Sequence, residues 1–364
     1  MTRDIDILTS EATNLLKEMI AIPSPSFNED KVCDHLCEWL VSKGIVHQRK
    51  SNNITARLSE QNGVKKEAFM HKPTLMLCAH IDTVEPSKEY SFDPYTPDYG
   101  TLPEGIIAGL GSNDDGASVV SMIATFRYFL KKDAPVDLLL VLTCEEERSG
   151  TNGMTGLWDD LKNEVDMAIV GEPTGMNAAT SERGLLVIDG TAHGISGHAA
   201  RNEGRNALYI ALEDIDKLRN HIFEKISPRM GRVNLNVTQI NAGTAHNVIP
   251  DRCSFVVDIR PNEMYDNVDI LNQLQDICQS ELKARNLTNR SSATPEGSRL
   301  LKAVEEAGIE TFSSPTTSDW MRISCDAIKM GPGDSSRSHK KDEYVFISEV
   351  NNAISTYINF IERL

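Results

Sequence analysis

The sequence predicts an α/β fold in which a mostly parallel mixed sheet carries helices on both faces, with a second, α+β domain inserted into the chain. Continuous apolar segments typical of buried strands alternate with segments of helical spacing in residues 1–181, and the same pattern returns in 293–364. Residues 182–292 instead show the apolar–polar alternation of strands with one solvated face. The length of 364 residues also exceeds that of a typical single domain, so we expect two domains.

In the first segment, helices are predicted where apolar residues recur at helical spacing, and strands where apolar residues are continuous. Pro23 ends the first helix and Gly44 closes the second. The predicted helices cover 6–22, 32–46 and 116–132, and the predicted strands lie at 73–80, 136–143 and 166–174. Residues 86–115 show little periodicity, and a loop of that length inside a compact domain is usually functional.

The inserted segment is predicted to run strand, helix, strand, strand, helix, which is typical of an α+β sandwich with one solvated sheet face. Its predicted strands lie at 183–194, 233–240 and 253–260, and its predicted helices at 205–219 and 268–284. In the last segment we expect a helix near 296–307, a GPGD turn at 331–334 and a final helix from about Ser348.

The composition limits the partners and the compartment. A formal net charge of −16 opposes binding to nucleic acid and to anionic membranes, because both would repel the chain. The seven cysteines form no CxxC pair and lie mostly in apolar or helical patterns, so we expect reduced core thiols. Charged residues stand at the N-terminus where a signal peptide would be apolar, and no apolar run reaches about 18 residues. These features predict a soluble, cytoplasmic protein.

Acidic and histidine side chains follow three predicted strands at the points where the strands end. His80 and Asp82 follow the first strand, the three glutamates at 145–147 follow the second, and Glu172 follows the third. A solvated acidic turn is the ordinary explanation for three adjacent glutamates. However, the carboxyl ends of parallel strands face one crevice, so these groups are expected to meet there. Imidazole and carboxylate groups from three strands favour a cation site.

Asp114 and Asp115 precede the helix predicted at 116–132, and a helix N-cap would account for one of them. Mixed His, Asp and Glu ligands suit Zn²⁺, or less selectively Mn²⁺ or Co²⁺. The spacing excludes an HExxH protease and a Cys-based zinc finger. GISGH at 194–198 lacks the second glycine of GxSxG, and GLGSND lacks the third glycine of a dinucleotide-binding loop.

Five segments together resemble a known family. They are AHIDTV at 79–84, GLGSND at 109–114, CEEE at 144–147, GEPT at 171–174 and GPGDSSRSHKKDEYV at 331–345, in the family's order and roughly its spacing. The chain resembles the co-catalytic zinc amidohydrolases that include aminoacylase, acetylornithine deacetylase, succinyl-diaminopimelate desuccinylase and the carboxypeptidase-G-like enzymes. The resemblance spans essentially the whole chain and implies a catalytic domain at 1–181 and 293–364. It also implies an inserted dimerisation (lid) domain at 182–292, and therefore a homodimer.

The resemblance further implies a centre with two Zn²⁺ ions. By position, the ligands of one zinc ion would be His80 and Glu172, those of the other Glu146 and His339, and the bridge between them Asp114. Two divalent ions about 3.5–4 Å apart carry four positive charges, of which three carboxylates compensate three. The remaining charge would hold a hydroxide and polarise an amide carbonyl.

Two more residues are expected beside these ligands. Glu145 resembles the family's general base, which takes a proton from the bridging water and returns it to the leaving amine. Asp82, two residues after His80 on the same strand face, would orient the imidazole as a hydrogen-bond acceptor. Side chains alternate along an extended segment, so Glu145 and Glu146 are expected to point different ways. We expect the chain to turn at Glu147 and assign that residue no catalytic role.

In the inserted domain, His198 in SGHAA resembles the histidine that family dimers lend to the partner's active site to steady the tetrahedral oxyanion. Asn247 in HNVIP and Arg260 in DIRP resemble its substrate contacts, and an arginine would hold an α-carboxylate by a two-pronged pair. The alternative for His198 is an ordinary half-buried histidine. For Arg260 it is a surface ion pair with Asp258 or Glu263.

The chain departs from the family after the bridging aspartate. The family usually shows Asp-Met-Lys-Gly, whereas residues 114–117 are Asp-Asp-Gly-Ala. The lysine is absent and a second acid stands beside the bridge, so the bridging role is open between Asp114 and Asp115. Alignment from the glycines at 109–111 favours Asp114, and the change is expected to alter metal affinity.

The resemblance implies hydrolysis of the amide bond of a small N-acyl amino acid. N-acetyl-L-ornithine is the first candidate, as in arginine biosynthesis. Its rivals are N-succinylornithine, N-acetylcitrulline and N-succinyl-diaminopimelate, because TTSDWMR at 316–322 resembles a desuccinylase segment. A dizinc di- or tripeptidase cleaves the same kind of bond and is the runner-up. A binding module that has lost catalysis is the alternative from another class, and a glutamate base beside the ligands argues against it.

Overall fold

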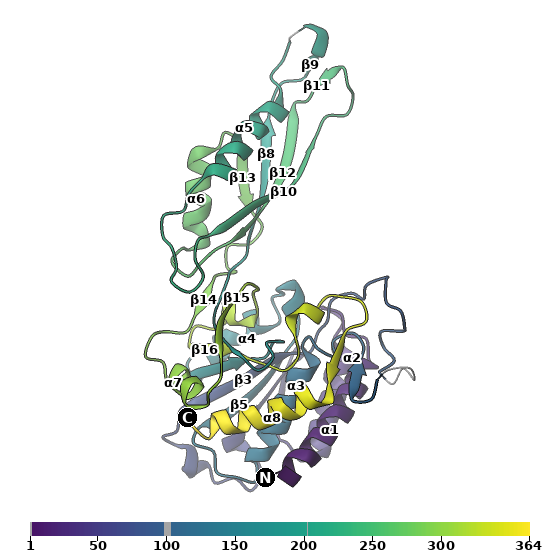
Figure 1. The fold of residues 1–364 in the computed structure, drawn as a ribbon, viewed down its shortest axis with the longest axis vertical. Coiled ribbons are helices and arrows are strands. Elements are labelled where there is room, and N and C mark those ends of the chain that lie inside the picture. The colour runs from purple at the N-terminus through teal and green to yellow at the C-terminus, as the bar shows by residue number, and fades with distance from the viewer. Residues whose placement is uncertain (1, 98–102, 202) are drawn as a thin grey trace. The chain divides into compact units, whose positions relative to one another are not determined.

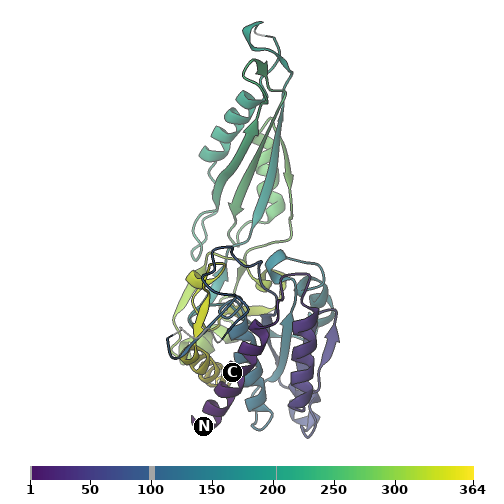
Figure 2. The same cartoon turned by 90° about the vertical axis from the view of Figure 1, so that its right-hand side faces the viewer.

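The computed structural model describes residues 2–97, 103–201 and 203–364, and the chain divides into two compact units. Unit 1 comprises Met1–Thr180, Thr294–Phe312 and Ser318–Leu364, and unit 2 comprises Ser181–Ala293 and Ser313–Thr317. Each unit has its own hydrophobic core. Unit 2 therefore interrupts unit 1 along the chain, as the ribbon colours show (Figures 1 and 2).

The sheet of unit 1 is parallel at its centre and antiparallel toward its edges. The central strands, which are parallel neighbours in this order, are β5 (Asp137–Thr143), β3 (Thr74–His80), β6 (Met167–Val170) and β16 (Asp326–Lys329). The antiparallel outer strands are β1 (Gln48–Lys50) and β2 (Asn53–Arg57) beside β5, and β7 (Ala178–Glu182) beside β16. Every residue of β3 and β5 is buried, as their continuous apolar sequences predict.

Helices cover both faces of this sheet, and alternate residues of β3 enter two different cores. Leu75 and Leu77 belong to the core that contains residues of five helices: α1 (Thr2–Ile20), α2 (Asp30–Ser42), α3 (Gly116–Phe129), α7 (Arg299–Glu306) and α8 (Ile347–Ile361). Met76 and Cys78 belong to the core that contains residues of α4 (Met154–Leu161) and η5 (Asp319–Arg322). The predicted α/β class is confirmed (Figure 1).

The stretch predicted as the loop 86–115 contains a short strand within its described residues. This strand, β4 (Ile106–Ala108), pairs with β17 (Tyr344–Phe346) from the other end of the chain. The remaining short elements of unit 1 are η1 (Leu58–Glu60), η2 (Lys66–Phe69), η3 (Glu146–Arg148) and η6 (Ser335–Arg337). Strands β1 and β2 were not predicted. All three residues of β1 are exposed and show no apolar pattern, and β2 is only five residues long.

Unit 2 is built on a four-stranded antiparallel sheet. Its strands, in spatial order, are β10 (Asn234–Ala242), β12 (Arg252–Arg260), β8 (Leu186–His193) and β13 (Glu281–Ala284). Helices α5 (Ala207–Asn220) and α6 (Asn267–Ile277) share one core with this sheet. Buried and more exposed residues alternate along β8 and β12, as predicted for strands with one solvated face. The shorter elements are β9 (Gly197–His198), η4 (Ala199–Arg201), β11 (Val248–Ile249), β14 (Ser292–Ala293) and, continuing from unit 1, β15 (Thr311–Ser314).

The helix predicted over 268–284 is wrong in its second half. Helix α6 ends at Ile277, and residues 281–284 form β13, which pairs with β8. The buried carboxylate of Asp214 accepts hydrogen bonds from the backbone N–H groups of Gln279 and Ser280 at 2.9 and 2.7 Å, and this turns the chain. A four-residue strand is too short for its alternation to override the helical spacing that precedes it.

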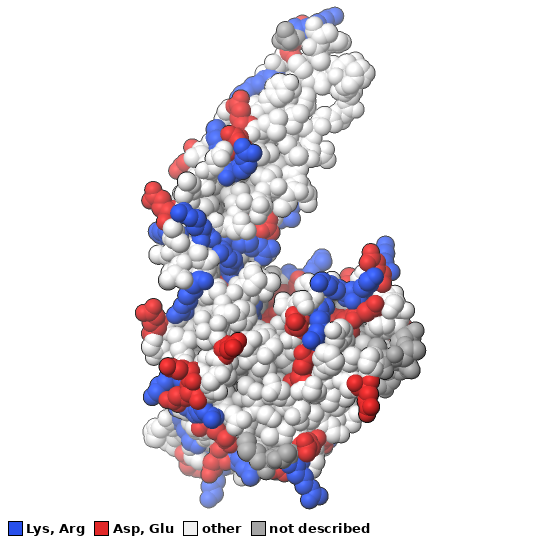
Figure 3. Space-filling view, viewed as in Figure 1, with Lys and Arg blue, Asp and Glu red and all other residues white. Residues whose placement is uncertain are grey.

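All seven cysteines are free thiols, as predicted. Among the described residues, none of the helices combines the length and the apolar character that a membrane span requires. On the faces of the two units shown in Figure 3, acidic and basic side chains are interspersed.

Candidate metal centre

Three neighbouring parallel strands end at one edge of the unit 1 sheet and bring the predicted residues there. β3 ends at His80, β5 ends at Thr143 just before the glutamates at 145–147, and β6 ends at Val170 just before Glu172. His80 lies directly opposite Thr143 in the register of the sheet. The carboxyl edge of an open α/β sheet is the usual place for a ligand site.

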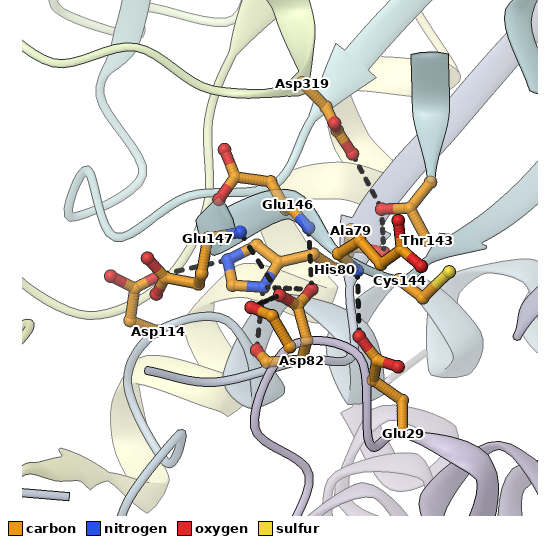
Figure 4. A network of polar contacts seen from close by, with 12 residues as sticks. Glu29, Ala79, His80, Asp82, Asp114, Thr143, Cys144, Glu146, Glu147 and Asp319 are labelled. Carbon is orange, nitrogen blue, oxygen red and sulfur yellow. Dashed lines mark hydrogen bonds and ion pairs between the residues drawn. The ribbon is translucent and has the colours of Figure 1, made fainter. Parts of the chain in front are cut away.

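His80 lies between two aspartates and is 3% exposed (Figure 4). Its Nε2 is 3.2 Å from Asp114 Oδ1, and its Nδ1 donates to the backbone carbonyl of Asp82 at 2.9 Å. The Asp82 carboxylate, predicted to be the acceptor, is farther away, at 3.5 Å. Burial lowers the pKa of His80, but hydrogen bonds with Asp114 and Asp82 raise it well above its usual value. An imidazole held through Nδ1 in this way presents Nε2 to a cation.

The possible ligand atoms gather into two groups that share Asp114. One group is His80, Asp114 and Glu172, the other is Asp114, Glu147 and His339, and within each group the atoms lie within 4.8 Å of one another. Nε2 of His339 is 2.9 Å from Glu147 Oε1 and 3.6 Å from Asp114 Oδ2. Asp114 is therefore placed to bridge two cations.

These groups contain Glu147 at the position predicted for Glu146. Strand β5 ends at Thr143 and Glu145 has a φ of 60°, so the side-chain alternation of a strand does not extend to the glutamates. Residues 146–148 form the 3₁₀ turn η3 instead. The chain turns here as predicted, but the turn brings Glu147, which was given no catalytic role, into one of the two groups.

The carboxylate of Glu145 is held by the loop that follows it. It accepts hydrogen bonds from the backbone N–H of Asn152 at 3.0 Å and from Asn152 Nδ2 at 2.7 Å. Gly150 packs so closely against this carboxylate that a Cβ at that position would lie 2.0 Å from Glu145 Oε2. These contacts occupy Glu145 in shaping the loop, contrary to the predicted role of general base.

Glu146 lies beside the two groups and, among the described residues, belongs to neither. Burial raises the pKa of Glu146 well above its usual value; the charge of His80 lowers it, and the charges of Glu172 and Glu147 raise it. Cations held by the neighbouring groups would lower this pKa. A buried carboxyl group next to two candidate cation positions has the surroundings of a general base.

Asp115 is not a member of either group of the described residues, whereas Asp114 belongs to both. Asp115 occupies the N-cap position of α3, but its side chain makes no capping hydrogen bond. It is 1% exposed, and burial raises its pKa to about 8. Of the two aspartates that the sequence left open, the geometry therefore favours Asp114 as the bridge.

Two buried glutamates that were not predicted support the backbone of the site. Glu343 accepts hydrogen bonds from the backbone N–H groups of residues 111, 113 and 114 at 3.1, 2.9 and 2.9 Å. Burial and the charge of Asp114 raise the pKa of Glu343 to about 8. Glu29 accepts a hydrogen bond from the backbone N–H of Glu145 at 3.1 Å. Glu343 lies inside the family-like segment 331–345, which could have indicated it, but no motif in the sequence pointed to Glu29.

The three predicted residues of the inserted domain lie in unit 2. His198 is exposed, and its Nδ1 accepts the backbone N–H of Ala200 at 3.2 Å. Arg260 forms a two-pronged ion pair with Asp258 at 2.9 and 3.2 Å, the alternative considered for it above. The backbone carbonyl of Asn247 accepts a hydrogen bond from the backbone N–H of Ala199 at 3.1 Å. The roles of these residues in catalysis stay predictions.

The donor set fits two divalent cations. Carboxylate oxygens from Asp114, Glu147 and Glu172 and imidazole nitrogens from His80 and His339 are ligands that suit Zn²⁺, Co²⁺ and Mn²⁺. Burial raises the pKa of Glu172 well above its usual value, and the charge of Asp114 raises it further. Clustered buried carboxylates are costly without a counter-charge, and cations at this position would offset that cost.

Two family profiles match the chain, one in each unit. Residues 180–286 match the peptidase dimerisation domain of the M20 type, and residues 53–175 match peptidase family M28. The first match covers most of unit 2, and the second contains β2, β3, β5 and β6, the strands around the candidate centre.

Curated proteins align with nearly the whole chain. The succinyl-diaminopimelate desuccinylase of Corynebacterium glutamicum is 26% identical over 379 residues, covering 96% of this chain and 95% of its own. The enzyme of the same name from Pelagibacter ubique is 24% identical, covering 98% of this chain and 99% of its own. A peptidase M20 domain-containing protein of Schizosaccharomyces pombe is 28% identical, covering 94% of this chain and 82% of its own.

Solved structures share the fold along the whole chain. A tripeptidase from Staphylococcus aureus has a TM-score of 0.75 at 18% identity, covering 97% of this chain and 98% of its own. An M20 metallo-carboxypeptidase from Sulfolobus solfataricus has a TM-score of 0.76 at 17% identity, with the same coverage. A dinuclear metal binding peptidase of the M20 family from Bacillus subtilis has a TM-score of 0.73 at 15% identity, covering 98% of each chain.

Proposed function

We propose that this chain, a hydrolase of the M20 metallopeptidase and amidohydrolase type, cleaves the amide bond of a small N-acyl amino acid. The products are a carboxylate and a free α-amine. The observation that supports this proposal best is the pair of ligand groups joined by Asp114, with Glu146 beside them. A dinuclear centre with an adjacent carboxyl group is the arrangement that metal-assisted hydrolysis requires.

The proposed mechanism divides the site residues between holding cations and moving a proton. His80 and Glu172 would hold one cation and Glu147 and His339 the other, and Asp114, which belongs to both groups, would serve both. When bound, two Zn²⁺ ions supply polarisation of the substrate carbonyl and lower the pKa of water.

Glu146 accepts a proton from the attacking water and later gives it to the nitrogen of the leaving amine. A residue in this role must hold the proton only between the two steps. The raised pKa of Glu146, which bound cations would lower again, suits such a temporary acceptor.

The substrate candidates differ in their acyl group. N-acetyl-L-ornithine is supported by the resemblance of the five segments to acetylornithine deacetylase. A succinyl group, as in N-succinylornithine or N-succinyl-diaminopimelate, is supported by the names of two relatives that align over nearly the full chain. N-acetylcitrulline presents the same amide, and so does a di- or tripeptide, which makes peptidase activity the second candidate function.

Kinetics with zinc-loaded protein separates these candidates. The panel holds N-acetyl- and N-succinylornithine, N-acetylcitrulline, N-succinyl-diaminopimelate and a set of di- and tripeptides. We expect kcat/KM for one N-acyl amino acid to exceed that for every peptide by at least about tenfold. Faster turnover of peptides would favour the peptidase instead. Activity that survives EDTA treatment and dialysis would contradict the cation centre.

We further propose that the protein is a homodimer formed through unit 2, which matches the peptidase dimerisation domain. Analytical ultracentrifugation should give twice the chain mass of 40.3 kDa. Deletion of residues 182–292, joined by a short Gly-Ser linker, should give a monomer. A full-length chain that sediments as a monomer at micromolar concentration would contradict the proposal.

A further inference from the structure

The glutamate turn is held by a set of buried side-chain oxygens. Four consecutive backbone N–H groups, those of residues 144–147, each donate to one oxygen. The acceptors, in chain order, are Asn53 Oδ1, Glu29 Oε1, Asp82 Oδ1 and Asp82 Oδ2, at 3.1, 3.1, 3.0 and 3.1 Å. The first N–H groups of a helical turn have no partner within the turn, so acceptors from elsewhere must complete them. We call Asn53, Glu29 and Asp82 the oxygen clamp.

Glu29 reaches this turn from a segment that is fastened to the end of β3. Ser26 Oγ donates to Asp82 Oδ2 at 2.7 Å, and the backbone N–H of Ser26 donates to the carbonyl of Thr83 at 3.1 Å. Glu29 is 1% exposed, and its carboxylate lies against the backbone of the turn (Figure 4). The two carboxylates of the oxygen clamp are therefore held by one local structure.

The Glu29 side chain does not serve the helix that it precedes. Glu29 is the N-cap residue of α2, but its side chain makes no capping hydrogen bond. Its Oε1 accepts instead from the backbone N–H groups of Phe27 and Glu145 at 2.8 and 3.1 Å. A capping role would have directed this oxygen to the first turn of α2.

We propose that Glu29 is a positioning residue that fixes the backbone of Glu145, and with it the directions of the Glu146 and Glu147 side chains. This inference rests on the proposed function, in which Glu146 is the base and Glu147 a ligand. Glu145 has a φ of 60°, a conformation that residues other than glycine adopt only when their surroundings hold them. Without an acceptor at Glu29, the buried N–H of Glu145 would lose its partner and the turn would relax.

The property that matters is the place of the acceptor oxygen and not its charge. Burial raises the pKa of Glu29, so its surroundings do not favour the charged form. Glu29→Gln keeps the oxygen at the same reach without the charge. Glu29→Asp keeps the charge but withdraws it by one methylene. Glu38→Gln, at an exposed position on the same helix, is the matched control.

Turnover at saturating Zn²⁺ is the first measurement. We expect kcat of Glu29→Asp to fall about 10- to 100-fold, the usual cost of losing a residue that orients a metal site. KM should stay within about twofold, because Glu29 is buried, with 1% of it exposed. Glu29→Gln should keep most of the turnover of Glu38→Gln. Equal turnover in all three variants would overturn the inference. So would a loss of turnover in Glu29→Gln together with normal turnover in Glu29→Asp.

Hydrogen–deuterium exchange of the backbone provides a measurement that does not depend on activity. We expect the amides of residues 145–147 to exchange at least about tenfold faster in Glu29→Asp than in Glu29→Gln. Equal exchange in these variants and the wild type would overturn the inference. If the wild type hydrolyses no substrate of the panel, the proposed function fails. The exchange rates of the amides of residues 145–147 then still test whether Glu29 holds the turn. If Glu29→Asp does not fold, slow exchange in Glu29→Gln supports the inference and fast exchange overturns it.

Discussion

The three glutamates at 145–147 meet three different sets of partners. Glu145 is bound by Asn152 in the following loop, and Glu147 lies 2.9 Å from His339 in one ligand group. Glu146 lies between these neighbours, where burial and nearby carboxylates raise its pKa. Adjacent residues of one chemical type can therefore differ in role, because a turn directs each into a different environment.

Isosteric amides test this assignment residue by residue. Glu146→Gln should lower kcat by about 10²- to 10⁴-fold, the usual contribution of a general base, and should keep both cations. Glu147→Gln should bind the cations more weakly, because an amide oxygen is a poorer ligand than a carboxylate. Steady-state kinetics and elemental analysis give the two measurements. Glu145→Gln is the control and should keep most turnover. If Glu145→Gln is inactive and Glu146→Gln is active, Glu145 is the general base, as the sequence first predicted.

The pair formed by His339 and Glu147 predicts a pH-dependent stability of the chain without cations. The hydrogen bond with Glu147 raises the pKa of His339 to about 9, above its ordinary value of 6.5. A group with a raised folded-state pKa stabilises the fold fully below 6.5 and loses this contribution as pH rises through 9. In EDTA, the Tm difference between wild type and His339→Ala should therefore be largest near pH 6 and shrink toward pH 10. A difference that widens with pH would contradict the pairing.

At the scale of secondary-structure elements, one buried aspartate separates α6 from β13. Asp214, on α5, accepts hydrogen bonds from the backbone N–H groups of Gln279 and Ser280 and from the Ser280 hydroxyl, and its side chain is fully buried. These contacts stop the helix and start the strand that completes the sheet of unit 2. The local sequence alone favours continuation of the helix. The boundary between α6 and β13 therefore depends on Asp214, which lies 65 residues before Gln279 in the chain.

Asp214→Ala should therefore destabilise unit 2. Removing the carboxylate leaves buried N–H groups without partners, at a cost of about 1–3 kcal/mol in the free energy of unfolding. Urea denaturation followed by circular dichroism measures this cost. Asp216→Ala, an exposed change on the same helix, is the control and should alter stability by less than about 0.5 kcal/mol. Equal midpoints for the two variants would show that the turn does not depend on Asp214.

At the scale of the whole molecule, the proposed homodimer predicts that one chain completes the site of its partner. His198 would be lent across the dimer, so the variants His198→Ala and Glu146→Gln should each be inactive alone. Mixed dimers should hold one site with both residues intact, which gives about one quarter of wild-type activity after random reassortment. Chains are mixed under mild denaturation, refolded and assayed. Mixed dimers that form without activity would contradict a shared site, and activity in His198→Ala alone would contradict its role.

Much of the fold was accessible from local patterns. The fully buried strands β3 and β5 appear in the sequence as continuous apolar runs, and β8 and β12 appear as alternating ones. Strand β1 was missed because it is exposed throughout, and β13 was missed because it is short and follows a helix. Strand β13 pairs with β8, which lies far away in the chain, so no local pattern decides it.

The sequence by itself determined the α/β class with its inserted α+β segment and the strand ends that bring acidic and histidine residues together, because apolar periodicity is local. The hydrolase type followed from the resemblance of five segments to a known family. Only the tertiary structure decided which partners each glutamate of the triplet meets. That choice depends on where β5 ends and on the left-handed backbone of Glu145. Both the oxygen clamp and the ligand partner of Glu147 lie 64 to 192 residues away in the chain, so no local pattern contains them.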